Sequence, residues 1–119
     1  MAELVRPNLQ LLDGRLAGDG WTTRTLALLV EPAGKARVIK AVLRNPHYNG
    51  AYLRNEVSVA LDGEEVFAGV VFAGESVTIE RPLPARQELL LELKSEAWMA
   101  PDVFDDRERA VILKLTERD

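Results

Sequence analysis

The sequence predicts an all-β fold, an antiparallel sandwich of two sheets with about eight short strands. Two observations carry this prediction. Apolar residues recur with a period of two in one segment after another, which is the pattern of strands that bury one face. Gly, Pro, Asn and Asp separate these segments, as turns do. A jelly roll and an immunoglobulin-like sandwich both fit this pattern, and a barrel is the alternative.

The alternation is clearest in the middle and at the end of the chain. Each alternating segment offers one set of apolar side chains to a core. The sets are Ile39, Ala41 and Leu43; Val57, Val59 and Leu61; Val77 and Ile79; Leu89, Leu91 and Leu93; and Val111, Leu113 and Leu115.

The dipeptide Asp62-Gly63 predicts a two-residue hairpin, because both central positions of a type I′ turn need positive φ. In the predicted register the opposing pairs are Leu61 with Glu64, Val59 with Val66, and Val57 with Ala68. The apolar faces of the two strands then coincide, and Val70 and Phe72 continue the second face.

Two corners and one irregular loop interrupt the strands. Ala73-Gly74 ends the second hairpin strand, and Pro82 and Pro84 form a stiff link that cannot continue a central strand. We expect the chain to pass between sheets at both places. The segment 98–109 lacks alternation, and its Pro-Asp pair at 101–102 indicates a short helical turn on a long loop.

Length and composition predict a single domain over residues 1–119, because 119 residues with 47% hydrophobic content can build one sandwich core but not two. The chain has 15 Lys and Arg against 19 Asp and Glu, a net charge of −4. The basic residues are scattered singly along the sequence, so we expect no nucleic-acid partner.

No segment predicts a membrane partner or an export signal. The longest apolar runs, such as 26–30, are far shorter than the roughly 20 residues that cross a bilayer. Glu3 and Pro7 stand where a signal peptide needs a cationic stretch followed by an apolar one. We therefore expect a cytoplasmic protein, unless an export signal or a larger chain precedes this sequence.

The sequence lacks the residues that most catalytic and cofactor sites need. The chain has no cysteine, which excludes disulfides, thiolate metal sites and cysteine nucleophiles. His47 is the only histidine, and no serine lies in a Gly-x-Ser-x-Gly motif, which argues against a hydrolase triad and a zinc site. The glycines form neither a dinucleotide-binding nor a P-loop motif. We therefore expect no cofactor, no metal and no catalytic residue.

Carboxylates alone leave two weaker possibilities. A glycosidase needs only two carboxylates at a suitable separation, and 19 acids always supply candidate pairs without giving a reason to prefer one. Asp102, Asp105 and Asp106 could offer oxygen ligands to Ca²⁺, but their spacing does not fit an EF-hand loop. A solvated acidic loop is the simpler interpretation.

The segment 44–55 is the candidate ligand site, and we assign it His47, Tyr48, Asn49 and Tyr52. Aromatic rings can stack on the C–H face of a sugar, while Asn, Arg and His supply the hydrogen bonds that fix its orientation. The alternative is an ordinary loop in which a tyrosine caps the end of the sandwich, as in a tyrosine corner.

The two tryptophans allow the same two interpretations. Trp21 follows Gly18-Asp19-Gly20 at the expected start of a strand, where a tryptophan usually packs on the core. Trp98 lies just before the irregular loop and is equally suited to the core and to the ligand site.

Two stretches carry a resemblance to a known family, namely 18–21 (Gly-Asp-Gly-Trp) and the segment from Ser95 through Pro101 to Val111. They resemble the small carbohydrate-binding-module-like β-sandwich domains attached to bacterial glycosyltransferases and methyltransferases of surface-polysaccharide biosynthesis. That family has an Asp-x-Arg-x-Leu-Gly-Val sequence before its last strand. Asp105, Arg107 and Val111 match it, but Arg109 replaces the leucine and Ala110 the glycine.

The resemblance implies an accessory role beside an enzyme, with a saccharide and an enzyme or another protein as candidate partners. It also implies that Asp105 and Arg107 form a structural salt bridge that holds the loop, since arginine cannot exchange protons at working pH. The leading hypothesis is a noncatalytic accessory or carbohydrate-binding sandwich in bacterial glycan assembly. The alternative is an immunoglobulin-like interaction or structural module, and a third is a small hydrolase.

Overall fold

The computed structural model describes residues 8–31, 38–46, 54–82, 88–103 and 105–118. In these ranges it has eight β-strands and no helix. The strands are β1 (Asn8–Asp13), β2 (Thr25–Glu31), β3 (Val38–Arg44), β4 (Arg54–Leu61), β5 (Glu64–Phe72), β6 (Ser76–Pro82), β7 (Leu89–Ser95) and β8 (Ile112–Arg118).

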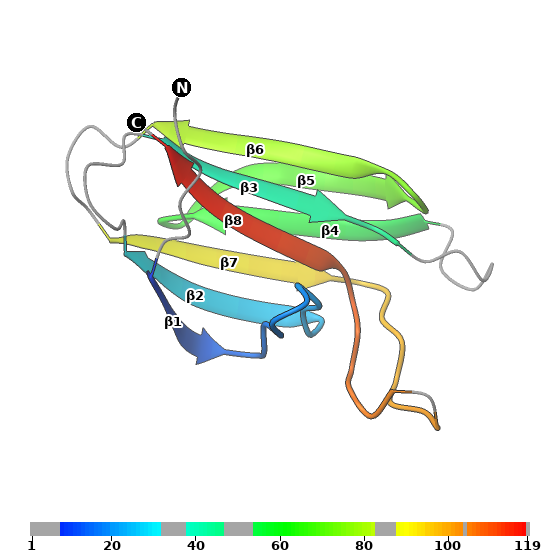
Figure 1. Cartoon of the computed structure of the whole chain (residues 1–119). Helices are drawn as coiled ribbons and strands as arrows, with labels where there is room; N and C mark the ends of the chain where they lie inside the picture. Colours follow the sequence, from blue (N-terminus) through cyan, green and yellow to red (C-terminus); the bar gives the residue numbers. More distant parts are fainter. Residues whose placement is uncertain (1–7, 32–37, 47–53, 83–87, 104, 119) are drawn as a thin grey trace.

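The strands form two antiparallel sheets that lie face to face (Figure 1). The larger sheet has the order β1-β2-β7-β4-β5 and the smaller sheet the order β6-β3-β8. The pairs β4·β5, β3·β6 and β2·β7 are nested, as if one long hairpin had been rolled up, which is the arrangement of a jelly roll. The predicted two-sheet sandwich is confirmed, and the fold is not a barrel.

The core lies between the inner faces of the two sheets. All the apolar sets predicted from the alternation point into it, and Val77 and Ile79 are half-buried at its margin. Each fully buried leucine or valine contributes about 1.5 to 3 kcal/mol relative to an exposed one. The predicted core faces of the alternating segments are therefore confirmed.

The hairpin at Asp62-Gly63 is confirmed, but its register was predicted wrongly beyond the first pairs. Asp62 and Gly63 have φ of 51° and 81°, and Leu61 lies opposite Glu64. A β-bulge in β5 then shifts the pairing by one residue, so that the true partners are Val59 with Phe67 and Val57 with Gly69.

The bulge moves the buried face of β5 onto other residues than those predicted. Val71 is 1% exposed, whereas Phe72 is 53% exposed on the opposite face, with Val70. Val66 and Phe67 stand next to each other at the bulge and both pack against the core. Because both are apolar, the hydrophobic pattern does not mark the inserted residue, and the prediction carried the wrong face to the end of the strand.

Both predicted corners carry the chain between the sheets. The turn after β5 closes with the Glu75 N–H bonded to the Phe72 carbonyl oxygen at 2.9 Å, and β6 then lies in the smaller sheet. β6 is an edge strand and ends at Pro82, as expected of a residue that cannot donate to a neighbouring strand. Pro84 lies outside the described residues.

The helical turn predicted within 98–109 is wrong, since residues 98–103 and 105–109 contain none. Met99 and Arg109 form an antiparallel bridge instead, with hydrogen bonds of 2.7 and 2.9 Å, so the loop doubles back on itself. The Asp102 carboxylate accepts the N–H of Asp105 at 2.9 Å. In a helix the N–H of Asp105 would donate to a backbone carbonyl oxygen. Here it donates to the Asp102 side chain instead, which favours a turn over a helix.

The smaller sheet leaves one end of the larger sheet uncovered. Leu9 and Leu11 of β1 lie opposite the buried Val30 and Leu28 of β2, yet they are 42% and 50% exposed. Beside them, residues 20–22 pair with the start of β8 through the bridge from Trp21 to Ile112. This open end is where the 14–24 segment and the 98–110 loop meet.

No helix in the described part of the chain has the length and apolar character needed to cross a membrane.

Candidate binding cleft

A cleft of about 620 Å³ lies between the 14–24 segment and the 98–110 loop, beside the uncovered end of the larger sheet. We call it the Trp21 cleft. One wall consists of Leu11, Arg15, Leu16, Ala17, Trp21 and Thr23, and the other of Pro101, Asp106, Arg107 and Glu108.

The position of Trp21 follows from the glycine that precedes it. Gly20 has φ of 97° and packs so closely on β8 that an added Cβ would lie 2.8 Å from the Ile112 side chain. The Leu113 N–H donates to the Gly20 carbonyl oxygen, and the Thr22 N–H to the Val111 carbonyl oxygen, both at 2.8 Å. Trp21 is therefore fixed between these two bonds. Its ring is half-buried and lines the cleft, rather than lying wholly in the core as we expected.

Arg107 connects the two walls of the cleft. Its Nε and Nη2 donate to the two carboxylate oxygens of Asp105 at 2.9 and 2.8 Å, which is the bidentate geometry suited to a guanidinium. Its Nη1 donates to Asp19 Oδ1 at 3.0 Å in the 14–24 segment, which supplies the opposite wall. The hydrogen bonds from Arg107 lower the pKa of Asp105 to about 2, and the same contacts raise the pKa of Arg107.

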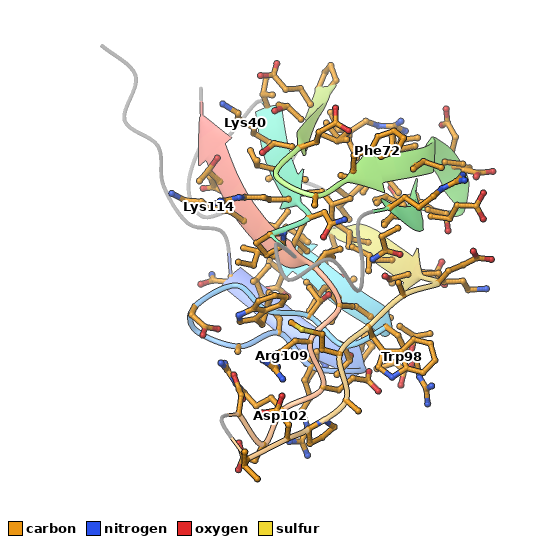
Figure 2. All side chains as sticks on the ribbon, turned by 90° about the vertical axis from the view of Figure 1, so that its right-hand side faces the viewer. Lys40, Phe72, Trp98, Asp102, Arg109 and Lys114 are labelled. Carbon is orange, nitrogen blue, oxygen red and sulfur yellow. The ribbon has the colours of Figure 1, made fainter. Side chains whose placement is uncertain are left out.

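The Arg109 side chain stabilises the 98–110 loop through hydrogen bonds to other residues of the loop. Its side chain is only 12% exposed, and it donates to Asp102 Oδ2 at 3.2 Å, to the Arg107 carbonyl oxygen at 3.2 Å and to the Ala100 carbonyl oxygen at 3.4 Å. Figure 2 shows Asp102 and Arg109 together at the end of the molecule that this loop forms. Arg109 therefore connects Asp102 with the backbone on both sides of the loop.

Trp98 lies on another side of the loop and does not line the cleft (Figure 2). The Arg24 guanidinium stacks over its ring at 4.3 Å from the centroid, a cation–π contact. Arg24 also contacts Glu108, with the Arg24 N–H donating to Glu108 Oε2 at 2.8 Å. One face of Trp98 is thus covered, and Arg24 links the ring to Glu108 in the wall of the cleft.

The structure describes only some of the predicted site residues. His47, Tyr48, Asn49 and Tyr52 lie outside the described residues, so the ligand site proposed for that segment stays a prediction. Asp105 and Arg107 are in direct contact through the ion pair described above.

Sequence reasoning missed Arg15, Thr23 and Glu108 of the cleft, and it considered Asp106 only as an oxygen ligand for Ca²⁺. Asp106 and Glu108 lie in the segment 95–111, which the sequence singles out, whereas no sequence pattern marks Arg15 and Thr23.

One pair of carboxyl groups stands close together outside the cleft. Glu56 of β4 and Glu96, just after β7, lie side by side on the outer face of the larger sheet. A hydrogen bond that the protonated Glu96 carboxyl donates to Glu56, together with the charge of Glu56, raises the pKa of Glu96. In the described ranges, three or more His, Asp or Glu side chains nowhere gather as a metal site would require.

Comparisons with known proteins identify no family for the chain. No family model matches it, and no curated protein matches it. Among solved structures it is similar to an exo-β-1,3-galactanase from Phanerochaete chrysosporium, solved with galactose, at 12% identity and a TM-score of 0.41. The similarity covers the whole of this chain but 29% of the length of that chain. At this identity and TM-score the galactanase shows nothing about what this chain binds.

Proposed function

We propose that this protein is a noncatalytic domain that binds a saccharide in the Trp21 cleft. The observation that carries the proposal is the position of the Trp21 ring, which lines an open cleft together with charged side chains from both walls. A saccharide presents apolar C–H faces and hydroxyl groups, so it needs an aromatic surface and a few placed donors and acceptors.

The polar groups of the cleft suit that role. Arg15 and Arg107 offer donors, and Asp106 and Glu108 offer acceptors. Arg107 is held by Asp105 and Asp19, so little side-chain entropy remains to be lost when a ligand binds. Such preorganisation favours a binding site.

The Glu56–Glu96 pair lacks the separation that a glycosidase needs. Glycosidases hold their two carboxyl groups about 5 Å or more apart, so that the glycosidic bond or a water fits between them. Glu56 and Glu96 are in hydrogen-bond contact, which leaves no such space, and they lie away from the Trp21 cleft. The accessory role beside an enzyme of bacterial glycan assembly follows the sequence resemblance and belongs to the same proposal.

A glycan array followed by calorimetric titration tests the proposal. The parent protein should bind a neutral or acidic bacterial glycan. Trp21→Ala should then weaken binding tenfold or more, because a stacked aromatic residue contributes about 1 to 3 kcal/mol and each 1.4 kcal/mol is a factor of ten. Phe72→Ala removes an exposed aromatic side chain outside the cleft and should leave affinity unchanged. Failure of the parent to bind any glycan, or equal losses in both variants, would reject the proposal.

A further inference from the structure

We propose that the free edge of β5 pairs with β5 of a second copy of the chain, so that the two five-stranded sheets join into one continuous sheet across a two-fold axis. This inference is independent of the proposed saccharide site.

β5 has the features of an edge that is left available for pairing. It is the last strand of the larger sheet, at the opposite end from β1 (Figure 1). It spans nine residues, and residues 66–72 read Val-Phe-Ala-Gly-Val-Val-Phe without a charge or a proline. Natural edge strands are normally protected by charges, proline, bulges or short length. An uncharged run of this kind favours strand pairing.

Each of the other three edge strands has a feature that hinders pairing over part of its length. β1 is a six-residue strand with an irregular register between Leu11 and Asp13, and β6 ends in Pro82. The first part of β8 is already paired with residues 20–22. β5 has a bulge only near the hairpin, which leaves its second half regular.

The hydrogen bonds within the sheet show which backbone groups of β5 point outward. The Glu96 N–H donates to the Glu56 carbonyl oxygen, so even-numbered residues of β4 face β7 and odd-numbered residues face β5. Val57 is odd-numbered and pairs with Gly69, so Gly69 faces β4. The N–H and C=O groups of its neighbours Ala68 and Val70 therefore point away from the sheet.

The turn that follows β5 confirms this direction and limits the free edge. Phe72 has the same orientation as Val70, and its N–H donates to Glu75 Oε1 at 3.0 Å while its carbonyl oxygen accepts the Glu75 N–H. The backbone groups of Phe72 are therefore already bonded, and the free edge of β5 ends before this residue. Within the ranges that the structure describes, no residue bonds the outward groups of Ala68 and Val70.

A second copy satisfies these groups by symmetry. If Gly69 lies on the two-fold axis, Ala68 of each chain stands opposite Val70 of the other. Each such pair exchanges both of its N–H···O bonds, as in any antiparallel ladder. Gly69 then meets its own copy in a close pair of about 4.5 Å between Cα atoms. Its lack of a side chain removes the obstacle to that approach.

The side chains beside the axis also fit a second copy of this strand. The side chains of Ala68 and Val70 lie on the outer face of the sheet. There, Ala68 of one chain packs against Val70 of the other chain. Residues 66–72 include no charged residue, so no like charges from this run face each other across the contact. A two-fold contact of this kind is isologous and closes at a dimer.

The dimer leaves both Trp21 clefts accessible. The cleft lies beside β1, at the opposite end of the larger sheet from β5. Two clefts on one rigid sheet would bind a repeating polymer with an avidity greater than the affinity of either cleft.

Sedimentation velocity of the full chain, from low to high micromolar concentration, tests the proposal. The parent should change from monomer to dimer as concentration rises. Val70→Pro removes an outward-pointing N–H but no hydrogen bond within the sheet, so it should remain folded and stay monomeric. Val70→Ala keeps this N–H and should still dimerise. A parent that stays monomeric, or a folded Val70→Pro that dimerises like the parent, would overturn the proposal.

Amide hydrogen exchange on the parent decides the question if Val70→Pro fails to fold. The N–H groups of Ala68 and Val70 should exchange quickly in dilute solution and become protected as concentration rises, whereas the inward-facing N–H of Gly69 should be protected throughout. Exchange at Ala68 and Val70 that does not change with concentration would overturn the proposal.

Discussion

Arg107 and Asp19 are 88 residues apart in the sequence, yet Nη1 of Arg107 donates to Asp19 Oδ1 at 3.0 Å. This contact joins the 98–110 loop to the segment that carries Trp21. Both partners are partly exposed, so the contact adds little to global stability and is weakened by salt. Its consequence is local, because it fixes the distance between the two walls of the cleft.

The first prediction concerns the pH dependence of the loop. Arg107 lowers the pKa of Asp105 from 3.8 to about 2, so the folded state favours the ionised carboxyl. The stabilisation is fully present above pH 3.8 and disappears as the pH falls through about 2. Asp105→Asn should therefore lower the melting temperature at pH 7, and the difference from the parent should vanish near pH 2. A difference that does not depend on pH would contradict this account.

The second prediction tests the shifted register of β5. Val71→Ala should destabilise the domain by about 2 kcal/mol, because it removes buried methyl groups and leaves a cavity. Val70→Ala makes the same change one residue earlier, on the outer face, and should cost less than about 0.5 kcal/mol in dilute solution. Urea unfolding of the two variants measures both values. The reverse order would show that β5 has the unshifted register.

The third prediction concerns Asn55, a buried residue at the start of β4. Its Nδ2 donates to Ser95 Oγ at 2.7 Å and to the Ala97 carbonyl oxygen at 3.1 Å, and its Oδ1 accepts the Ala97 N–H at 2.9 Å. Asn55→Ala should destabilise the domain by about 2 kcal/mol or more, because it leaves partly buried polar groups without partners. Arg54→Ala, at the exposed neighbour, is the matched control and should be close to neutral. Equal urea midpoints for the two variants would contradict the prediction.

The fourth prediction separates the two interpretations of the segment 44–55. If Tyr48 and Tyr52 stack on a saccharide, Tyr48→Ala and Tyr52→Ala should weaken glycan binding about tenfold and leave the melting temperature unchanged. If a tyrosine caps the sandwich, the same variants should melt several degrees lower and bind glycan as the parent does. Melting curves and glycan titrations on the two variants distinguish these outcomes.

The core of the fold could be predicted because strand alternation and turn chemistry are local signals. Ile39, Val59 and Leu91 are buried as the alternation requires, and Asp62-Gly63 forms the expected turn. The bulge could not be predicted, because two adjacent apolar residues satisfy either register.

The cleft could not be predicted for a different reason. Trp21 was expected in the core, because its own neighbourhood looks like the start of a strand. Its environment is set by Arg107 and by Ile112, which are far away in the sequence. Local patterns carry no information about such contacts. No sequence pattern marks the contacts of Arg109 with Asp102 and with the loop backbone, because they depend on how the loop folds.

An NMR titration of the ¹⁵N-labelled protein with the best glycan from the array tests the central claim most directly. If the saccharide binds in the Trp21 cleft, the indole N–H of Trp21 and the backbone N–H groups of Thr23 and Glu108 should shift together and saturate at one Kd. The N–H signals of Ala68 and Val70, at the far edge of the sheet, should not shift. Shifts confined to residues outside the cleft would contradict the account and would move the binding site elsewhere on the sandwich.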